Sequence, residues 1–224
     1  MRRKAFIFIL AAGICSHLAA QVKPGIEVLQ ETRFKALEGK RIGLITNPTG
    51  VDSRLKSTID ILFEAPNVNL VALYSPEHGI RGDATAGEEF GNENDARTGL
   101  PVFSLYGKNK KPQPEILQGI DVLVYDMQDI GCRSYTYIST MGLAMEAAAE
   151  NNIEFVVLDR PNPLGGNRFE GQPNVEPHLV SMVSRFPVTY VHGFTVGELA
   201  TFLNQEGLLT NQVKCKLTVI KMKG

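Results

Sequence analysis

Four short runs of aliphatic residues in this chain each end abruptly in charged, amide, glycine and proline residues. The runs are RIGLITNPTG (41–50), LVALYSPEHGIRG (70–82), DVLVYDMQDIGCRSY (121–135) and EFVVLDRPNPLGG (154–166). Parallel strands are buried on both faces and therefore read as continuous aliphatic stretches. Because ligands bind beyond the carboxyl ends of such strands, the four polar tails are where we expect the chemistry.

Extended and helical patterns alternate along the rest of the chain. Strands are predicted at 41–46, 69–74, 100–107, 121–127, 154–159 and 216–224. Helices are predicted at 25–39, 53–64, 113–120, 139–152 and 195–207, the last with a Thr195/Glu198 capping box. The alternation predicts an α/β fold: a Rossmann-like open, mostly parallel sheet with helices on both faces. Two polar stretches, 75–99 and 160–190, are long enough to be functional or disordered loops.

The first 20 residues have the order of a secretory signal peptide: three basic residues, an apolar stretch over 5–14, and small residues up to Ala20. A membrane span needs roughly 20 apolar residues, so we expect cleavage and no stable membrane anchor. The exported protein, periplasmic or secreted, would then begin near residue 21. Because a strand that ends the chain at Gly224 would form an exposed sheet edge, we expect 21–224 to be part of a larger protein.

Composition narrows the possible partners and chemistry. The chain has 23 basic and 24 acidic residues, and no basic block follows the signal, which argues against nucleic acid or anionic membrane as partner. Only Cys132 and Cys215 follow the signal, and the sequence leaves open whether they pair. No Cys/His spacing fits zinc, so no metal site is expected.

Three catalytic fingerprints are missing from the strand ends. The first turn, GLITNPTG, lacks G-x-G-x-x-G, which argues against a nicotinamide or flavin cofactor. The pattern G-x-x-x-x-G-K-[ST] of P-loop nucleotide hydrolases does not occur, and neither does the G-x-S-x-G of serine hydrolases. We therefore expect the site to bind a ligand other than a nucleotide, and we expect no cofactor.

The tail after the second strand, SPEHGIRG, places Glu77, His78 and Arg81 in a turn constrained by proline and glycine. A carboxylate there is a candidate general acid or nucleophile, and the neighbouring cations are candidates to tune its pKa or to hold an anionic group. The alternative is an exposed turn with incidental charges. Because proline and glycine constrain how the turn presents these side chains, we favour the functional role over an exposed turn.

The next two tails supply amides, carboxylates and further arginines. Asp126 and Gln128 alternate onto one side of a strand end, as a site for hydroxyl groups requires, while Asp129 and Arg133 could instead form a local ion pair. The remaining candidates are Asn47, Tyr135, Asp159, Arg160, Asn162, Arg168, Glu170, Gln172 and His192. Trp is absent, so sugar stacking would depend on Tyr74, Phe90, Tyr106, Tyr125, Tyr135 or Tyr137. Together these residue types indicate a polyhydroxylated, possibly anionic ligand.

The strings TNPTGVD, YSPEHGIRG, YDMQDIGCRSYTY, LDRPNPLGG and EGQ occur in this order, and the chain closely resembles the exo-β-N-acetylmuramidases of glycoside hydrolase family 171, formerly domain of unknown function 1343. The resemblance implies a Rossmann-like catalytic domain over 21–224, followed in the family by a smaller C-terminal domain that this chain lacks. It also implies a cleft between the two domains. The implied activity is release of N-acetylmuramic acid from non-reducing ends of peptidoglycan fragments, so muropeptide sugars are the expected substrates.

The resemblance also suggests roles for the polar tails. Glu77 becomes the best catalytic candidate, as general acid, and Asp126, Asp159 and Glu170 compete for the second carboxylate role. The lactyl carboxylate of the sugar would suit Arg81, Arg133 or Arg160. Retaining, inverting and substrate-assisted mechanisms stay open, since a 2-acetamido sugar can supply its own nucleophile.

Two other functions remain possible at this point. One is a binding module for muramyl sugars that performs no catalysis. The other is a metal-dependent hydrolase that uses His78 with Asp126 or Asp129.

Overall fold

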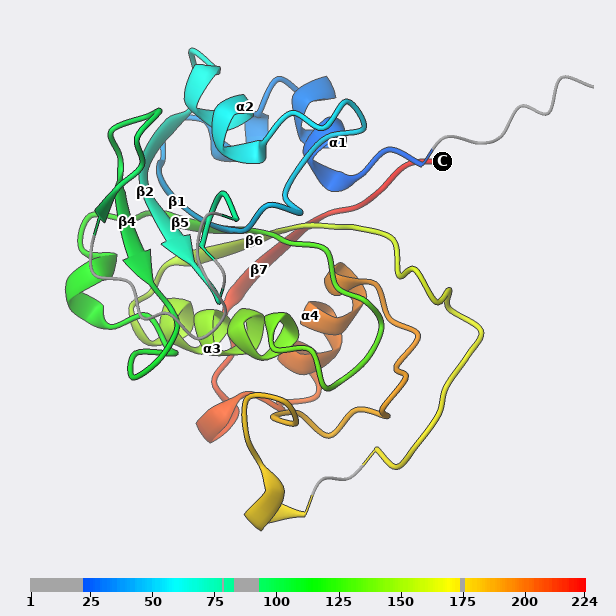
Figure 1. Cartoon of the computed structure of the whole chain (residues 1–224). Helices are drawn as coiled ribbons and strands as arrows, with labels where there is room; N and C mark the ends of the chain where they lie inside the picture. The colour runs from blue at the N-terminus through cyan, green and yellow to red at the C-terminus, as the bar shows by residue number, and fades with distance from the viewer. Residues whose placement is uncertain (1–21, 78, 83–92, 174–175) are drawn as a thin grey trace, which may run out of the picture.

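The computed structural model of the chain describes residues 22–77, 79–82, 93–173 and 176–224 (Figure 1). Within these ranges the fold is built on a seven-stranded sheet with the order β3-β4-β2-β1-β5-β6-β7. The strands are β1 (Arg41–Thr46), β2 (Asn69–Ser75), β3 (Glu93–Asn94), β4 (Pro101–Ser104), β5 (Val122–Asp126), β6 (Glu154–Leu158) and β7 (Lys216–Ile220). All neighbours are parallel except β3 and β4. The predicted α/β class and mostly parallel sheet are confirmed.

The strand order reverses beside the first strand. From β1 the chain adds β2 and then β4 on one side, and it returns to add β5, β6 and β7 on the other. Such a reversal separates the loops that leave neighbouring strands, and it is the usual place for a ligand in an open parallel sheet. We therefore expect a ligand site at the carboxyl ends of β1, β2 and β5.

Helices cover both faces of the sheet, as the alternating pattern predicts. On one face lie α1 (Gly25–Glu31) and α2 (Thr58–Glu64), and on the other lie α3 (Tyr137–Glu150) and α4 (Val196–Gln205) (Figure 1). The 3-10 helices are η1 (Lys35–Leu37), η2 (Pro114–Leu117), η3 (Pro177–Leu179) and η4 (Thr210–Gln212). Alternate residues of each strand face opposite layers, so the sheet separates two apolar clusters.

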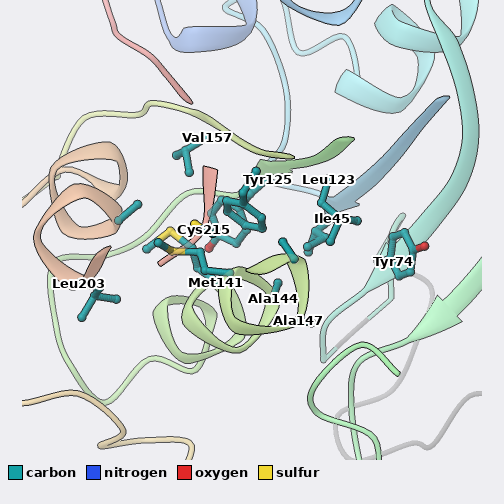
Figure 2. Close-up of a cluster of buried hydrophobic side chains, with 14 of the residues drawn as sticks. Ile45, Tyr74, Leu123, Tyr125, Met141, Ala144, Ala147, Val157, Leu203 and Cys215 are labelled. Carbon is teal, nitrogen blue, oxygen red and sulfur yellow. The ribbon is translucent and has the colours of Figure 1, made fainter. Parts of the chain in front are cut away.

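The larger cluster lies between the sheet and the α3/α4 layer (Figure 2). Leu123 and Tyr125 of β5 meet Met141 and Ala144 of α3 there, and all four are fully buried or nearly so. Small alanines along α3 let the helix approach the strands closely. Each buried large side chain contributes roughly 1.5–3 kcal/mol through the hydrophobic effect, so this layer fixes the position of the helix that follows β5.

Several of the predicted helix and strand boundaries were wrong. The helix expected over 25–39 stops at Glu31, because Arg33 and Phe34 adopt left-handed backbone conformations. The helix expected from residue 53 starts at Thr58, where Ser57 caps it. The segment 113–120 forms only the short η2, and β3 was not predicted. The capping box of Thr195 and Glu198 on α4 is confirmed.

The two ends of the described chain lie side by side on the α1 face. Lys23 pairs with Lys223 in an antiparallel bridge, next to α1 (Figure 1). Among the described strands β7 pairs only with β6, so it forms one edge of the sheet, as expected. No helix in the described ranges has the length and apolar character that crossing a membrane requires.

Candidate active site

Glu77 stands directly beyond the carboxyl end of β2. Pro76 separates it from the strand, and the Ser75 hydroxyl donates a hydrogen bond to the Pro76 carbonyl at 3.0 Å. Ser75 and Pro76 are buried, whereas Glu77 is only half-buried. The residues that lead into the turn are therefore buried, and the Glu77 carboxylate stays accessible.

A cavity of about 400 Å³ opens beside Glu77. Besides Glu77 after β2, its wall comes from three segments that the sheet brings together: the turn after β4, the start of α3, and the long loop before α4. The lining residues are Glu77, Leu105, Tyr106, Gly107, Lys110, Thr136, Thr140, Met182 and Val183. A mixed polar and apolar wall with one carboxylate suits a sugar ring, whose faces are apolar and whose edges carry hydroxyl groups.

Tyr137 brings a phenol close to the Glu77 carboxylate. Burial raises the pKa of Tyr137, a hydrogen bond from the Asn47 side chain lowers it, and the charge of Glu77 raises it again; the net pKa is raised. Asn47 can donate because its Oδ1 already accepts from the backbone N–H of Thr49 at 2.9 Å. Asn47, Glu77 and Tyr137 therefore form a polar cluster in which the phenol stays protonated.

Asp126 is fully buried at the end of β5, next to β1. Arg160 donates to it twice, from Nε to Oδ1 at 2.6 Å and from Nη2 to Oδ2 at 2.9 Å. The Thr58 hydroxyl adds a third hydrogen bond at 2.5 Å. Asp126 and Arg160 thus satisfy each other, and neither carboxylate oxygen is exposed to a substrate.

The loop after β1 packs directly on this ion pair. Arg160 Nη2 also donates to the Val51 carbonyl at 2.8 Å, and the Thr46 hydroxyl donates to the Asp126 carbonyl at 2.8 Å. Gly50 makes the approach possible, since a Cβ there would lie 2.1 Å from Thr46 Oγ1. Buried side chains therefore occupy the point where the strand order reverses, and the accessible cavity lies beyond β2 and β4.

Arg81 is committed to a second ion-pair network, away from the lining of the Glu77 cavity. Its Nε and Nη2 donate to Asp95 at 2.5 and 3.0 Å, and Nη2 also donates to Asp60 at 3.1 Å. Hydrogen bonds from Arg81 hold the pKa of Asp95 at about 2. Arg97 completes the network by pairing with Asp60 at 2.7 Å. Arg81 therefore fastens the turn after β2 to α2.

His192, in the segment before α4, and Asp129, in the loop after β5, form a buried pair. His192 Nε2 lies 3.1 Å from Asp129 Oδ2, which also accepts from the Gly131 N–H at 2.7 Å. His192 Nδ1 accepts from the Phe194 N–H at 3.2 Å, which makes Nε2 the protonated nitrogen of the neutral ring. Asp129 Oδ1 is buried without a hydrogen-bond partner among the described residues. The pair joins the loop after β5 to the segment before α4.

Other predicted binding residues join the same two loops. Arg133 donates to the carbonyls of Gln172 and Val188, and Asn162 donates to the carbonyl of Phe194. Gln128 donates to the carbonyls of Asp129 and Pro161. These side chains hold backbone carbonyls, which leaves them little freedom to recognise a ligand. Tyr135 is 47% exposed.

Asp159 ends β6 and caps α4. It accepts from the Gly197 N–H at 2.8 Å and from the Thr195 hydroxyl at 3.1 Å, yet burial raises its pKa above the usual value. It also lines a separate cavity of about 500 Å³ between α4 and β7. Glu198 and Glu206 share that cavity with one cation, Lys221, which makes it a poor place for an anionic sugar.

Glu170 lies on the exposed loop after β6, where it pairs with Arg168. It does not line the Glu77 cavity. Consequently none of Asp126, Asp159 and Glu170 meets Glu77 there, and Glu77 is the one carboxylate among the described lining residues.

His78 and Phe90 fall outside the described residues. Within the described ranges no group of three His, Cys, Asp or Glu side chains is placed to hold a metal ion.

Cys132 and Cys215 are free thiols, one half-buried and one buried. Tyr74 and Tyr125 belong to the core, so stacking on a sugar falls to Tyr106, Tyr135 or Tyr137.

Two residues of the site were not among the expected binding or catalytic groups. Tyr137 was considered only for stacking, although its position just after the third aliphatic run (121–135) was a usable signal. Lys110 gave no signal, because KNKKP after the third predicted strand reads as a solvated charged turn. Its relevance comes from the fold, which places that turn over the Glu77 cavity.

Comparison with known proteins identifies what this arrangement is similar to. The sequence profile of the family described as exo-beta-N-acetylmuramidase NamZ, N-terminal, matches residues 42–224. The peptidoglycan beta-N-acetylmuramidase NamZ of Bacillus subtilis is 55% identical over 203 residues, which cover 91% of this chain and 48% of that protein.

Two crystal structures of DUF1343 family proteins from Bacteroides fragilis are also similar. The first is 66% identical, with a TM-score of 0.84 and coverage of 91% of this chain and 50% of that chain. The second is 38% identical, with a TM-score of 0.77 and coverage of 91% and 52%. The chain therefore spans about half the length of the relatives it matches.

Proposed function

Because the chain belongs to the NamZ family of exo-β-N-acetylmuramidases, whose N-terminal region it matches over 42–224, we propose that it provides the catalytic half of such an enzyme. The substrate would be a peptidoglycan fragment with N-acetylmuramic acid at its non-reducing end. The observation that carries the proposal is the accessible Glu77 carboxylate in a sugar-sized cavity at the carboxyl edge of the sheet.

Glu77 acts as the general acid in this proposal. Its protonated carboxyl group transfers a proton to the glycosidic oxygen while the bond from that oxygen to C1 breaks. The Tyr137 phenol, held by Asn47 and close to Glu77, remains a neutral hydrogen-bond donor beside the reacting groups. Its proximity orients the carboxyl group and offers a donor to a sugar oxygen.

A substrate-assisted route agrees best with the single carboxylate among the described lining residues. The acetamido oxygen of the sugar would attack C1 as the leaving group departs, forming an oxazolinium ion. Water would then add to C1 and lose a proton to the Glu77 carboxylate, which restores the acid. Asp126 would take no direct part in this chemistry and would only stabilise the fold, because Arg160 and Thr58 donate hydrogen bonds to its carboxylate oxygens.

Export is part of the proposal, since peptidoglycan lies outside the cytoplasmic membrane. The basic, apolar and small-residue order of the first 20 residues supports a cleaved signal peptide. Cleavage would release the protein into the periplasm or the medium.

Incubating the full chain with the disaccharide N-acetylmuramyl-β-1,4-N-acetylglucosamine tests the function. We expect mass spectrometry to detect free N-acetylmuramic acid, and a chelator should leave the rate unchanged. Activity abolished by chelation would instead support the metal-dependent alternative. Saturable binding of the disaccharide without any release would support the binding-module alternative.

A further inference from the structure

The three arginines that the sequence offered for a ligand carboxylate are all engaged elsewhere. Arg160 holds Asp126, Arg81 holds Asp95 and Asp60, and Arg133 holds two backbone carbonyls. None of them lines the cavity at Glu77. An anionic substituent on a sugar bound there therefore needs a different cation.

Lys110 is the one cationic residue in the described lining of that cavity. It lies in the turn after β4, it is exposed, and no hydrogen bond or ion pair involves its ammonium group within the described ranges. A lysine ammonium is a compact point charge with three donors on a flexible stem. Lys110 can therefore reach an anion at the cavity mouth without breaking an existing contact.

A second cavity, of about 330 Å³, adjoins the first at Lys110 and Met182. Lys108, Lys111 and Arg185 also line it. Lys111 pairs with Glu150 at 2.7 Å, and Arg185 lies 3.5 Å from the buried Glu146. These pairs neutralise the inner cations, which leaves Lys108 and Lys110 as the positive charges of this surface. Of these two, only Lys110 also faces the cavity at Glu77.

We propose that Lys110 is a specificity residue that binds the lactyl carboxylate of the muramyl sugar in the Glu77 cavity. The inference rests on the proposed function for the identity of the sugar. N-acetylmuramic acid differs from N-acetylglucosamine by this one anionic ether substituent. A single cation at the mouth of a cavity with one acid gives the site a means to select the anionic sugar and to set its orientation toward Glu77.

Binding of N-acetylmuramic acid and of its uncharged methyl ester to the full chain, measured by calorimetry, tests this proposal. We expect the acid to bind about 3-fold more tightly than the ester, the usual size of one solvent-exposed ion pair. Lys110→Met should remove that preference, and Lys110→Arg should keep most of it. Lys35→Met, which removes an exposed lysine on η1, is the matched control and should behave like the unaltered chain.

Each outcome separates this inference from the proposed function. An undiminished preference in Lys110→Met, or equal or undetectable binding of both ligands by the unaltered chain, would overturn the role of Lys110. Loss of preference in Lys110→Met but not in Lys35→Met supports it. If the unaltered chain shows that Lys110-dependent preference but releases no N-acetylmuramic acid from the disaccharide, the hydrolase proposal fails and the carboxylate site stands.

Discussion

Arg160 binds both carboxylate oxygens of Asp126, with its Nε 2.6 Å from Oδ1 and its Nη2 2.9 Å from Oδ2. Both side chains are buried, at the point where the strand order of the sheet reverses. In many open α/β sheets that position holds a ligand. Here an internal ion pair occupies it, and the loop after β1 rests on the arginine through the Val51 carbonyl.

Removing one partner of this pair should cost stability. We expect Asp126→Asn to lower the free energy of unfolding by about 3 kcal/mol, because it leaves the buried Arg160 charge without its counter-ion. Asp121→Asn, which alters an exposed carboxylate at the start of the same strand, should cost less than about 1 kcal/mol. Urea denaturation measures both. An Asp126→Asn protein with normal stability and no activity would instead favour direct catalysis by Asp126.

The Arg81–Asp95 pair makes the fold sensitive to acid. Hydrogen bonding to Arg81 holds the pKa of Asp95 at about 2, below its usual value of about 3.8. A lowered pKa in the folded state adds stability above the unfolded pKa, and this stability is lost as the pH falls from about 4 to about 2. Thermal unfolding across this range should show a steeper loss for the unaltered chain than for Asp95→Asn. Parallel curves would contradict the prediction.

Gly142 in α3 should resist replacement by alanine. Helix propensity alone predicts a gain of about 1 kcal/mol. A Cβ at this position, however, would lie 2.1 Å from the ring of the buried Phe186. We therefore expect Gly142→Ala to lower the free energy of unfolding by roughly 1–3 kcal/mol. Chemical denaturation measures the change, and the additional substitution Phe186→Leu should recover part of the loss. A more stable Gly142→Ala protein would refute the packing argument.

The two described cysteines should differ in reactivity. Burial raises the pKa of Cys215 to about 11, so almost none of it is thiolate at pH 8, and its side chain lies in the core (Figure 2). Cys132 is half-buried on the loop after β5. Alkylation of the native protein at pH 8, mapped by peptide mass spectrometry, should modify Cys132 first. Faster modification of Cys215 would show that this part of the core opens readily.

The sequence predicted the sheet well because buried parallel strands leave a strong local signal. The run RIGLIT corresponds to β1 residue for residue, and strand ends elsewhere moved by at most a few positions. The predicted helix boundaries were less accurate where the backbone adopts a left-handed conformation, as at Phe34, because no residue type there requires that conformation.

The site was harder to predict, since a side chain's partner is decided by the fold. Arg81 and Arg160 were candidates for a ligand carboxylate because the sequence cannot reveal that Asp95 and Asp126 already bind them. Glu77 kept its candidacy because the constraint on its turn is local. The position of Lys110 at the Glu77 cavity follows only from the fold, which places β4 beside β2.

The central claim is that Glu77 is the general acid, and Glu77→Gln tests it most directly. The amide keeps the size and much of the hydrogen bonding of the side chain but cannot donate the proton. We expect release of N-acetylmuramic acid from the disaccharide to fall at least about 100-fold in kcat, with an unchanged melting temperature and nearly unchanged binding of the sugar. Release at the rate of the unaltered chain would contradict the claim.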